Sequence, residues 1–298
     1  MYTIKAPCKI NLSLDITSKR EDGYHLIESL FHTVNLYDII NIEKSDEYKI
    51  STSGKFALKD ESEDNIVTKI FKYFKNDMGL KDNYNIHIEK NIPTGAGLGG
   101  GSSDAANVIK FFLNELNIKA DNNLIESFSK FGADIPFFIK GGCAWVSGIG
   151  EKIINYDFTL PYDIILIFPN IHVSTKLAYS KFVKEDFNKS DIFAIKNMLD
   201  NKNIDFKSIV SHTYNIFEKN VFNLENKIES IKIQAENILN RKVSMSGSGS
   251  SLFALYERDD KNIDSDLEKL KSQMNIDIYK LSLMHRSQTY CIKYSLVF

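Results

Sequence analysis

The densest group of residues that could bind a ligand lies between Pro93 and Ala106. Five of the seven residues from 95 to 101 are glycine, and two serines and an aspartate follow at once. Glycines at this density let the backbone come close to a ligand and adopt positive φ angles. Backbone amides that converge at a helix start bind anions, because the helix dipole is positive there. The segment therefore predicts a phosphate-binding loop, and we infer that its ligand is a nucleotide.

The residues on either side predict the elements that must position this loop. Upstream, Tyr84, Ile86 and Ile88 alternate with polar residues, which is typical of a half-buried strand. Downstream, apolar residues recur at steps of three and four and predict an amphipathic helix: Ala105, Val108, Ile109, Phe112, Leu113 and Leu116. Ser102 or Ser103 is the expected N-cap of that helix.

Three familiar loop types do not fit the segment. A Walker A loop ends in Gly-Lys-Ser/Thr, whereas Ser102 follows Gly101 here. The letters Gly95-x-Gly97-x-x-Gly100 match a dinucleotide fingerprint, but the acidic residue at the required distance, Asp121, opens a helical stretch and ends no strand. A protein-kinase loop is excluded because no His-Arg-Asp or Asp-Phe-Gly follows.

Five stretches of the chain resemble the GHMP kinases, named for galactokinase and the homoserine, mevalonate and phosphomevalonate kinases. The loop Pro93-x-x-x-Gly97-Leu98-Gly99-Gly100-Gly101-Ser102-Ser103-x-Ala105 resembles their phosphate loop, and residues 245–253 resemble their second glycine motif. Residues 9–14, Asp22-Gly23-Tyr24-His25 and residues 132–138 resemble the branch that acts on 4-diphosphocytidyl-2-C-methyl-D-erythritol. The resemblance extends in order from about residue 5 to about residue 255.

This resemblance implies an activity. It implies ATP-dependent phosphorylation of the 2-hydroxyl of 4-diphosphocytidyl-2-C-methyl-D-erythritol, giving the 2-phosphate and ADP. The reaction belongs to non-mevalonate isoprenoid (terpenoid) precursor biosynthesis. ATP is the expected phosphoryl donor, and Mg²⁺ is expected to arrive with the nucleotide, because this ion keeps much of its water shell. We expect few protein ligands for this ion and no protein-bound structural metal.

The resemblance also implies the catalytic residues. Asp134 corresponds to the general base and Lys9 to the cation beside it, whose charge favours the ionised forms. From the residues alone, Asp134 fits an N-cap or turn position equally well, between Gly132 and Pro136. The expected nucleotide-binding residues are Pro93, Thr94, Gly95, Ala96, Gly97, Leu98, Gly99, Gly100, Gly101, Ser102 and Ser103, and either serine is expected to reach a phosphate or the metal ion.

The acceptor site is implied in the same way. His25 is expected to hydrogen-bond the cytosine edge, with Tyr24 and Tyr179 against the faces of the base. The second glycine motif is expected to close the cleft, although a plain strand-to-helix turn needs glycines as well. The full expected set of substrate-binding residues is Asn11, Tyr24, His25, Tyr179, Gly247 and Ser248.

Composition narrows the class of protein and its partners. The 298 residues carry a formal net charge of −2, with 43% hydrophobic and 26% charged residues, which is ordinary for a globular protein. This charge offers no global attraction to nucleic acid or membrane, so we expect a small-molecule partner only. Cys8, Cys143 and Cys291 lie far apart and in no metal-type spacing, which indicates reduced thiols in a cytoplasmic protein. Monomer and weak dimer both stay open.

The mixture of strands and helices predicts an α+β fold. The resemblance implies two domains, a nucleotide-binding domain over 1–157 and a ferredoxin-like domain over 158–298. Between Ile10 and Ile16 apolar and polar residues alternate, which predicts a strand. Regular alternation would put Lys9, Asn11 and Ser13 on one face, and Ile10, Leu12 and Leu14 on the other.

Two other functions compete with this one. A GHMP kinase for another small alcohol, such as mevalonate or homoserine, has no use for a cytosine-reading Tyr24-His25 pair. A catalytically silent nucleotide-binding regulator has no need for Lys9 and Asp134, and both are present.

Overall fold

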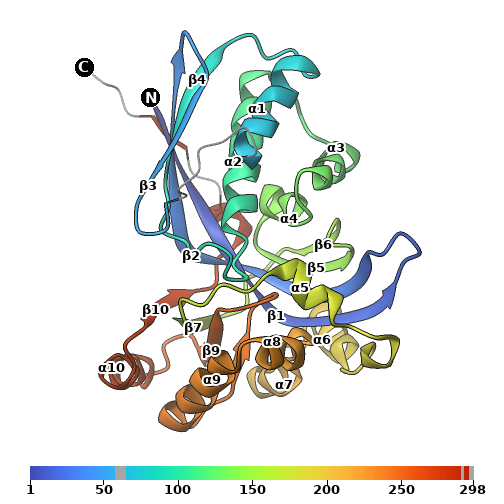
Figure 1. The fold of residues 1–298 in the computed structure, drawn as a ribbon, viewed down its shortest axis with the longest axis vertical. Helices are drawn as coiled ribbons and strands as arrows, with labels where there is room; N and C mark the ends of the chain where they lie inside the picture. Colours follow the sequence, from blue (N-terminus) through green and yellow to red (C-terminus); the bar gives the residue numbers. More distant parts are fainter. Residues whose placement is uncertain (58–64, 290–291, 295–298) are drawn as a thin grey trace.

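The structure, a computed structural model, describes residues 1–57, 65–289 and 292–294. It contains two β-sheets with helices packed against each, as Figure 1 shows. The first sheet contains β1 (Tyr2–Lys19), β2 (His25–Ser45), β3 (Lys49–Ser53), β4 (Asn83–Glu89), β5 (Cys143–Gly148), β6 (Lys152–Tyr156) and β11 (Ile292–Tyr294). The second contains β7 (Tyr162–Phe168), β8 (Val243–Met245), β9 (Leu252–Glu257) and β10 (Asp277–Ser282). The predicted α+β class is confirmed.

Helices lie in several of the connections between these strands. The α-helices are α1 (Ile66–Asn76), α2 (Gly100–Glu115), α3 (Asn122–Ser127), α4 (Ile135–Lys140), α5 (Thr175–Ser180), α6 (Ile192–Asp200), α7 (Phe206–His212), α8 (Phe217–Leu224), α9 (Asn226–Leu239) and α10 (Ile263–Gln273). Single 3₁₀ turns are η1 (Phe128–Lys130), η2 (Lys184–Asp186) and η3 (Arg286–Gln288).

The first sheet is built around the long antiparallel hairpin of β1 and β2. The sheet order is β11-β1-β2-β4-β3, and β5 joins the other half of β2. Among the strand pairs of this sheet in the described part of the chain, β3 and β4 alone are parallel. Helices α1 and α2 cover one face (Figure 1), where Phe74 and Phe112 pack in the same buried cluster as Ile86 of β4. Burial of these large side chains stabilises the position of α2 against the sheet.

The second sheet has the topology of a ferredoxin-like fold. Its order is β10-β7-β9-β8, with every pair antiparallel. Along the chain, β7 is followed by helices α5 to α9, then β8, β9, α10 and β10. This β-α-β-β-α-β connectivity is the ferredoxin-like arrangement that was expected.

The two sheets share a buried cluster, which packs one against the other. The cluster combines Ile10 and Leu12 of β1 and Trp145 of β5 with Leu166 of β7 and Phe253 of β9, all at most 1% exposed. At its far end the chain returns to the first sheet, where β11 pairs with β1. The domain boundary between residues 157 and 158 stays a prediction.

The predicted regular alternation in the first strand is wrong. β1 has irregularities in its pairing with β2 between Pro7 and Cys8 and between Asn11 and Ser13. Such bulges shift which face the following side chains occupy. Ile10 and Leu12 therefore lie in the cluster between the sheets, whereas Leu14 and Ile16 lie in the larger cluster.

The helix after the glycine loop starts earlier than predicted. Its N-cap is Gly99, in the left-handed region with φ +70°, so neither Ser102 nor Ser103 is the N-cap. Gly99 replaces them because the chain must turn sharply out of the loop, a conformation that glycine adopts without strain. Asp121 is the N-cap of α3 and accepts a hydrogen bond from Leu124 N at 2.8 Å, in agreement with the exclusion of a dinucleotide fingerprint.

The cysteines and the length of the apolar helices can be compared with the predictions from sequence. Cys8 and Cys143 are buried free thiols, and Cys291 lies outside the described residues. Across residues 1–57, 65–289 and 292–294, no helix is long and apolar enough to cross a membrane.

Candidate functional site

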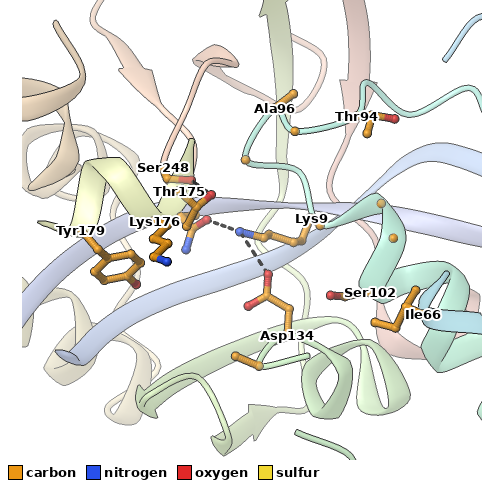
Figure 2. A pocket seen from close by; sticks show the side chains of 18 of the residues that line it. Lys9, Ile66, Thr94, Ala96, Ser102, Asp134, Thr175, Lys176, Tyr179 and Ser248 are labelled. Carbon is orange, nitrogen blue, oxygen red and sulfur yellow. Dashed lines mark hydrogen bonds and ion pairs between the residues drawn. The ribbon is translucent and has the colours of Figure 1, made fainter. Parts of the chain in front are cut away.

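A cavity of about 860 Å³ gathers nearly all of the residues that the sequence singled out. It runs between the glycine loop, the β1–β2 hairpin, α4, α5 and the segment before β9 (Figure 2). The predicted residues that line it are Lys9, Asn11, Tyr24, His25, Pro93, Thr94, Gly95, Ala96, Gly97, Gly99, Gly100, Gly101, Ser102, Asp134, Tyr179, Gly247 and Ser248. Leu98 and Ser103 do not line it.

Leu98 and Ser103 instead attach the glycine loop and the start of α2 to β1. Leu98 is buried, and its carbonyl accepts a hydrogen bond from Lys9 N at 3.0 Å. Ser103 is fully buried and its hydroxyl donates to Pro7 O at 2.6 Å, so this serine does not face the cavity. Of the two serines expected to reach a phosphate, Ser102 alone lines the cavity.

The glycine loop presents backbone amides to the cavity. Gly95, Gly97 and Gly99 all have positive φ, between +66° and +76°. The first helical hydrogen bond of α2 runs from Ser103 N to Gly99 O, at 2.9 Å. The amides of the helix's first turn therefore have no partner within the helix, and they sit at its positive end. This arrangement suits a phosphate group.

The second glycine segment docks directly on the first. Ser246 links them: its hydroxyl donates to Gly97 O at 3.0 Å and accepts from Asn11 N at 3.2 Å. Ser251 N donates to Ala96 O at 3.2 Å. The contact is so close that a Cβ on Gly97 would lie 2.0 Å from Ser246 O. Only glycine fits there.

Lys9 and Asp134 face each other at the middle of the cavity. Figure 2 shows the lysine reaching from β1 toward the carboxylate, with Lys9 Nζ 3.7 Å from Asp134 Oδ2. The ammonium also donates to Asn11 Oδ1 and lies 4.6 Å from the ring centroid of Phe31. Burial lowers the pKa of Lys9, and the carboxylate of Asp134 opposes this shift by favouring the charged form.

Asp134 stands at the start of a helix without capping it. It occupies the N-cap position of α4, followed closely by Pro136, but its side chain makes no capping hydrogen bond. The side chain points to Lys9 and is 28% exposed, so the carboxylate is accessible from the cavity. The rigid helix start fixes the backbone while the side chain is available to a ligand.

An aromatic group forms one end of the cavity. The ring of His25 lies 5.2 Å from that of Tyr179 and 5.9 Å from that of Phe187, measured between centroids. Its Nε2 is buried with no hydrogen-bond partner among the described residues. Burial, with a smaller contribution from Lys19, lowers the pKa of His25, which favours the neutral ring. Tyr24 stands at the rim with 59% of its surface exposed.

Sequence reasoning missed Asn215, a buried residue whose side chain contacts the second glycine segment. This residue is buried, and its amide donates to the carbonyls of Met245 and Gly247 at 2.6 and 2.8 Å. It therefore holds the second glycine segment in place. It lies in the polar stretch between β7 and β8, where no motif marks it.

Lys90 and Asp104 were also missed, although both line the cavity. Lys90 Nζ lies 2.5 Å from Asp104 Oδ2 and also contacts Asp38, and all three side chains are buried. Burial raises the pKa of Asp104 to about 7, and the charge of Lys90 opposes the rise. Within the described residues there is no cluster of three or more His, Cys, Asp or Glu side chains that could hold a metal ion.

Comparison with known proteins agrees with this geometry. Residues 65–142 match the family described as GHMP kinases N terminal domain. A protein of Persephonella marina named 4-diphosphocytidyl-2-C-methyl-D-erythritol kinase is 40% identical over 270 residues, covering 85% of this chain and 91% of the relative. One of the same name from Chlorobium phaeovibrioides is 32% identical, covering 94% of each chain. The chain belongs to this kinase family.

Solved structures place the kinase in the same fold. A crystal structure of 4-(cytidine 5'-diphospho)-2C-methyl-D-erythritol kinase superimposes with a TM-score of 0.74 at 29% identity, covering 94% of this chain and 98% of the other. A homoserine kinase from Cytophaga hutchinsonii superimposes with a TM-score of 0.70 at 18% identity, covering 98% and 96%. The second likeness shows the shared fold alone.

We expect Gly97→Ala to destabilise the kinase by about 2 kcal/mol or more, because alanine would be strained at positive φ and would collide with Ser246 O. Urea unfolding without nucleotide measures the effect. Gly101→Ala is the matched control, because a Cβ at this position meets nothing within 4 Å. Gly101 also lies inside α2, where alanine has the higher helix propensity. Equal stability of the two variants would contradict the close docking of the glycine segments.

Proposed function

We propose that this kinase transfers the γ-phosphoryl group of ATP to the 2-hydroxyl of 4-diphosphocytidyl-2-C-methyl-D-erythritol. One observation carries the proposal. The Lys9–Asp134 pair lies in the middle of one cavity, between a phosphate-binding loop and an aromatic pocket with an unpartnered histidine nitrogen. A phosphoryl donor and a base-bearing acceptor therefore meet at the pair from opposite ends.

The glycine loop forms the donor end. The first-turn amides of α2 and the hydroxyl of Ser102 hold the phosphates of ATP. Membership of a kinase family supports ATP as the donor. Mg²⁺ would arrive with the phosphates and keep much of its water shell, and the hydroxyl of Ser102, which lines the cavity at the glycine loop, would be available to it. When bound, this ion neutralises part of the triphosphate's charge.

The aromatic pocket forms the acceptor end. The Nε2 atom of neutral His25 bonds the edge of cytosine, while Tyr24 and Tyr179 pack against the base. Lys19 and Lys176 also line this end, and their positive charges suit the diphosphate of the acceptor. Asn11, Gly247 and Ser248 line the wall between the two ends, where the acceptor's alcohol lies.

Phosphoryl transfer follows from this placement. Asp134 takes the proton of the acceptor hydroxyl while the hydroxyl oxygen forms a bond to the γ-phosphorus of ATP. The bond between the γ-phosphorus and the oxygen that leaves with ADP breaks. Lys9 stabilises the negative charge that develops on the attacking oxygen, since its ammonium is held in a buried setting where charge interactions are strong. Asn11 and Phe31 keep this ammonium in position.

The first test is acceptor choice. We expect ADP release from ATP and Mg²⁺ with 4-diphosphocytidyl-2-C-methyl-D-erythritol, and none above background with mevalonate or homoserine, which have no cytosine for the pocket. A coupled ADP assay measures this. Turnover with mevalonate or homoserine alone would contradict the acceptor assignment and keep the kinase chemistry.

The role of Asp134 predicts a selective loss of turnover. Asp134→Asn keeps the shape of the side chain and removes the base, so kcat should fall by about 10²–10⁴ while ATP affinity changes little. Steady-state kinetics and nucleotide titration measure the two quantities. Asp264→Asn, an exposed carboxylate on α10, is the control and should keep full activity. Near-normal turnover of Asp134→Asn would remove it from the role of base.

The role of His25 predicts a selective loss of acceptor binding. His25→Ala should raise KM for the cytidine substrate about tenfold or more, because one hydrogen bond and one packing surface are lost, while KM for ATP stays the same. His87→Ala is the control, since that ring bonds Ser51 and Ser53 and does not line the cavity. An unchanged KM for the cytidine substrate would refute base reading by His25.

A further inference from the structure

The hydrogen bonds of Asn11 continue from the cavity to a residue behind its wall. Asn11 lines the cavity, and its Oδ1 accepts a hydrogen bond from the ammonium of Lys9. Its Nδ2 donates to Ser29 Oγ at 3.0 Å. Ser29 lies in β2, is 0% exposed and does not line the cavity. The hydroxyl of Ser29 therefore acts on the site through Asn11 and not through a ligand.

The hydroxyl of Ser29 can only accept a hydrogen bond from Asn11. A serine hydroxyl carries a single proton, and Ser29 donates it to the carbonyl oxygen of Ser13 at 2.6 Å. That carbonyl oxygen is an acceptor and has no proton to give. The Asn11 atom that faces Ser29 must therefore be the amide nitrogen, which supplies the proton of this contact.

The two ends of the Asn11 amide thus meet opposite requirements. An ammonium has donors and no acceptor, so Lys9 requires the amide oxygen. Ser29 requires the amide nitrogen, because its own proton is already donated elsewhere. A rotated amide would place its NH₂ group against the ammonium and its oxygen against the serine oxygen. All three side chains are buried, so the lost hydrogen bonds could not be replaced by water.

The groups around the Asn11 amide are themselves held in place. Within β2, Ser29 pairs with Leu14 of β1 on one side and with Val146 of β5 on the other. The second glycine segment packs closely on the amide, since a Cβ on Gly247 would lie 3.3 Å from Asn11 Oδ1. The amide therefore lies between a strand paired on both sides and a tightly docked loop.

A fixed acceptor matters for Lys9 because its ammonium ends a flexible side chain. Lysine has many rotamers, and holding one of them costs conformational entropy. In Figure 2 the side chain extends toward Asp134, with Lys9 Nζ 3.7 Å from Asp134 Oδ2. A displacement of about 1 Å in an active site can cost about 10²-fold in rate. The orientation of the Asn11 amide therefore bears directly on the chemical step.

We propose that Ser29 is a positioning residue for phosphoryl transfer. It sets the orientation of the Asn11 amide, and the amide oxygen in turn holds the ammonium of Lys9 beside Asp134. The inference rests on the proposed function, in which the Lys9–Asp134 pair acts on the reacting atoms. Because Ser29 contacts neither ATP nor the acceptor, its removal should lower the rate of the chemical step and leave substrate binding unchanged.

Ser29→Ala tests this division between rate and binding. We expect kcat with ATP, Mg²⁺ and 4-diphosphocytidyl-2-C-methyl-D-erythritol to fall about tenfold, because one buried hydrogen bond that orients the amide is lost. KM for ATP and for the cytidine substrate should stay within about twofold of wild type. Ser29→Thr keeps the hydroxyl and should keep kcat within about threefold. An unchanged kcat in Ser29→Ala would overturn the proposal.

Tyr256→Phe is the matched control for a general loss of stability. The hydroxyl of Tyr256 is also buried and donates to Asp266 Oδ2 at 3.1 Å, in the second sheet and away from the cavity lining. Urea unfolding should show that both variants are less stable than wild type, whereas kcat should fall in Ser29→Ala alone. An equal fall of kcat in both would trace the effect to stability and refute positioning by Ser29.

A double-mutant cycle tests whether the effect of Ser29 passes through Asn11. Asn11→Ala removes the whole amide, so Ser29 then has nothing to orient. Adding Ser29→Ala to Asn11→Ala should therefore change kcat by less than about twofold. If the second substitution lowered kcat as much in this background as in wild type, Ser29 would act independently of Asn11 and the proposal would be wrong.

Ser29→Cys keeps the inference testable if Ser29→Ala does not fold. The thiol fills a similar volume, but sulfur is a weak hydrogen-bond acceptor. We therefore expect kcat of Ser29→Cys to lie below that of Ser29→Thr. Equal kcat values for these two variants would also overturn the proposal.

Failure of the proposed function would look different. Wild-type turnover with mevalonate or homoserine alone would contradict the acceptor assignment, and the same variants would then test Ser29 with that alcohol. A wild-type protein that turned over none of these alcohols would contradict the proposed function and this inference together. Normal wild-type turnover with an unchanged kcat in Ser29→Ala would contradict the inference alone.

Discussion

The site depends on the contact between two glycine segments that lie about 150 residues apart in the chain, Gly97 in the first and Ser246 in the second. The backbones approach so closely that no side chain fits at Gly97. This contact brings the loop of the first sheet and the segment between β8 and β9 of the second to the same place. The proposed phosphate-binding amides and the proposed acceptor wall are therefore placed relative to each other by a backbone contact, which is more rigid than a pair of flexible side chains.

The buried charge of Lys9 in this cavity is surrounded by partners. Lys9 is buried, yet it is matched with Asp134, Asn11 and the face of Phe31, so its ammonium has partners on several sides. Burial makes each of these interactions stronger than it would be in water, and it also penalises a missing partner. In the proposed reaction, the lysine can stabilise transient negative charge because these neighbouring groups already hold its ammonium in one position.

Much of this could be predicted from the chain. The strand, loop and helix around the glycines follow from local periodicity, and the resemblance to a kinase family supplied Lys9, Asp134 and His25. The sequence could not reveal Asn215, because its role depends on carbonyl groups near Met245 and Gly247 that only folding brings to it. The same holds for Asp104: in the sequence it is one more polar residue in a helix, and its buried, unpaired oxygen exists only in three dimensions. The start of α2 was missed because a serine is the usual N-cap, whereas this turn requires the left-handed Gly99.

The bulges in β1 have a consequence for how this chain can change during evolution. A regular strand sends alternate side chains to two fixed faces, but β1 must supply Ile10 and Leu12 to one core and Leu14 and Ile16 to another, with Lys9 and Asn11 at the site between them. The irregularity between Asn11 and Ser13 makes this possible. Deletion of a single residue here would restore even alternation and exchange the two faces beyond that point. We therefore expect this strand to tolerate substitutions of similar shape better than insertions or deletions, so that its length is constrained more tightly than its composition.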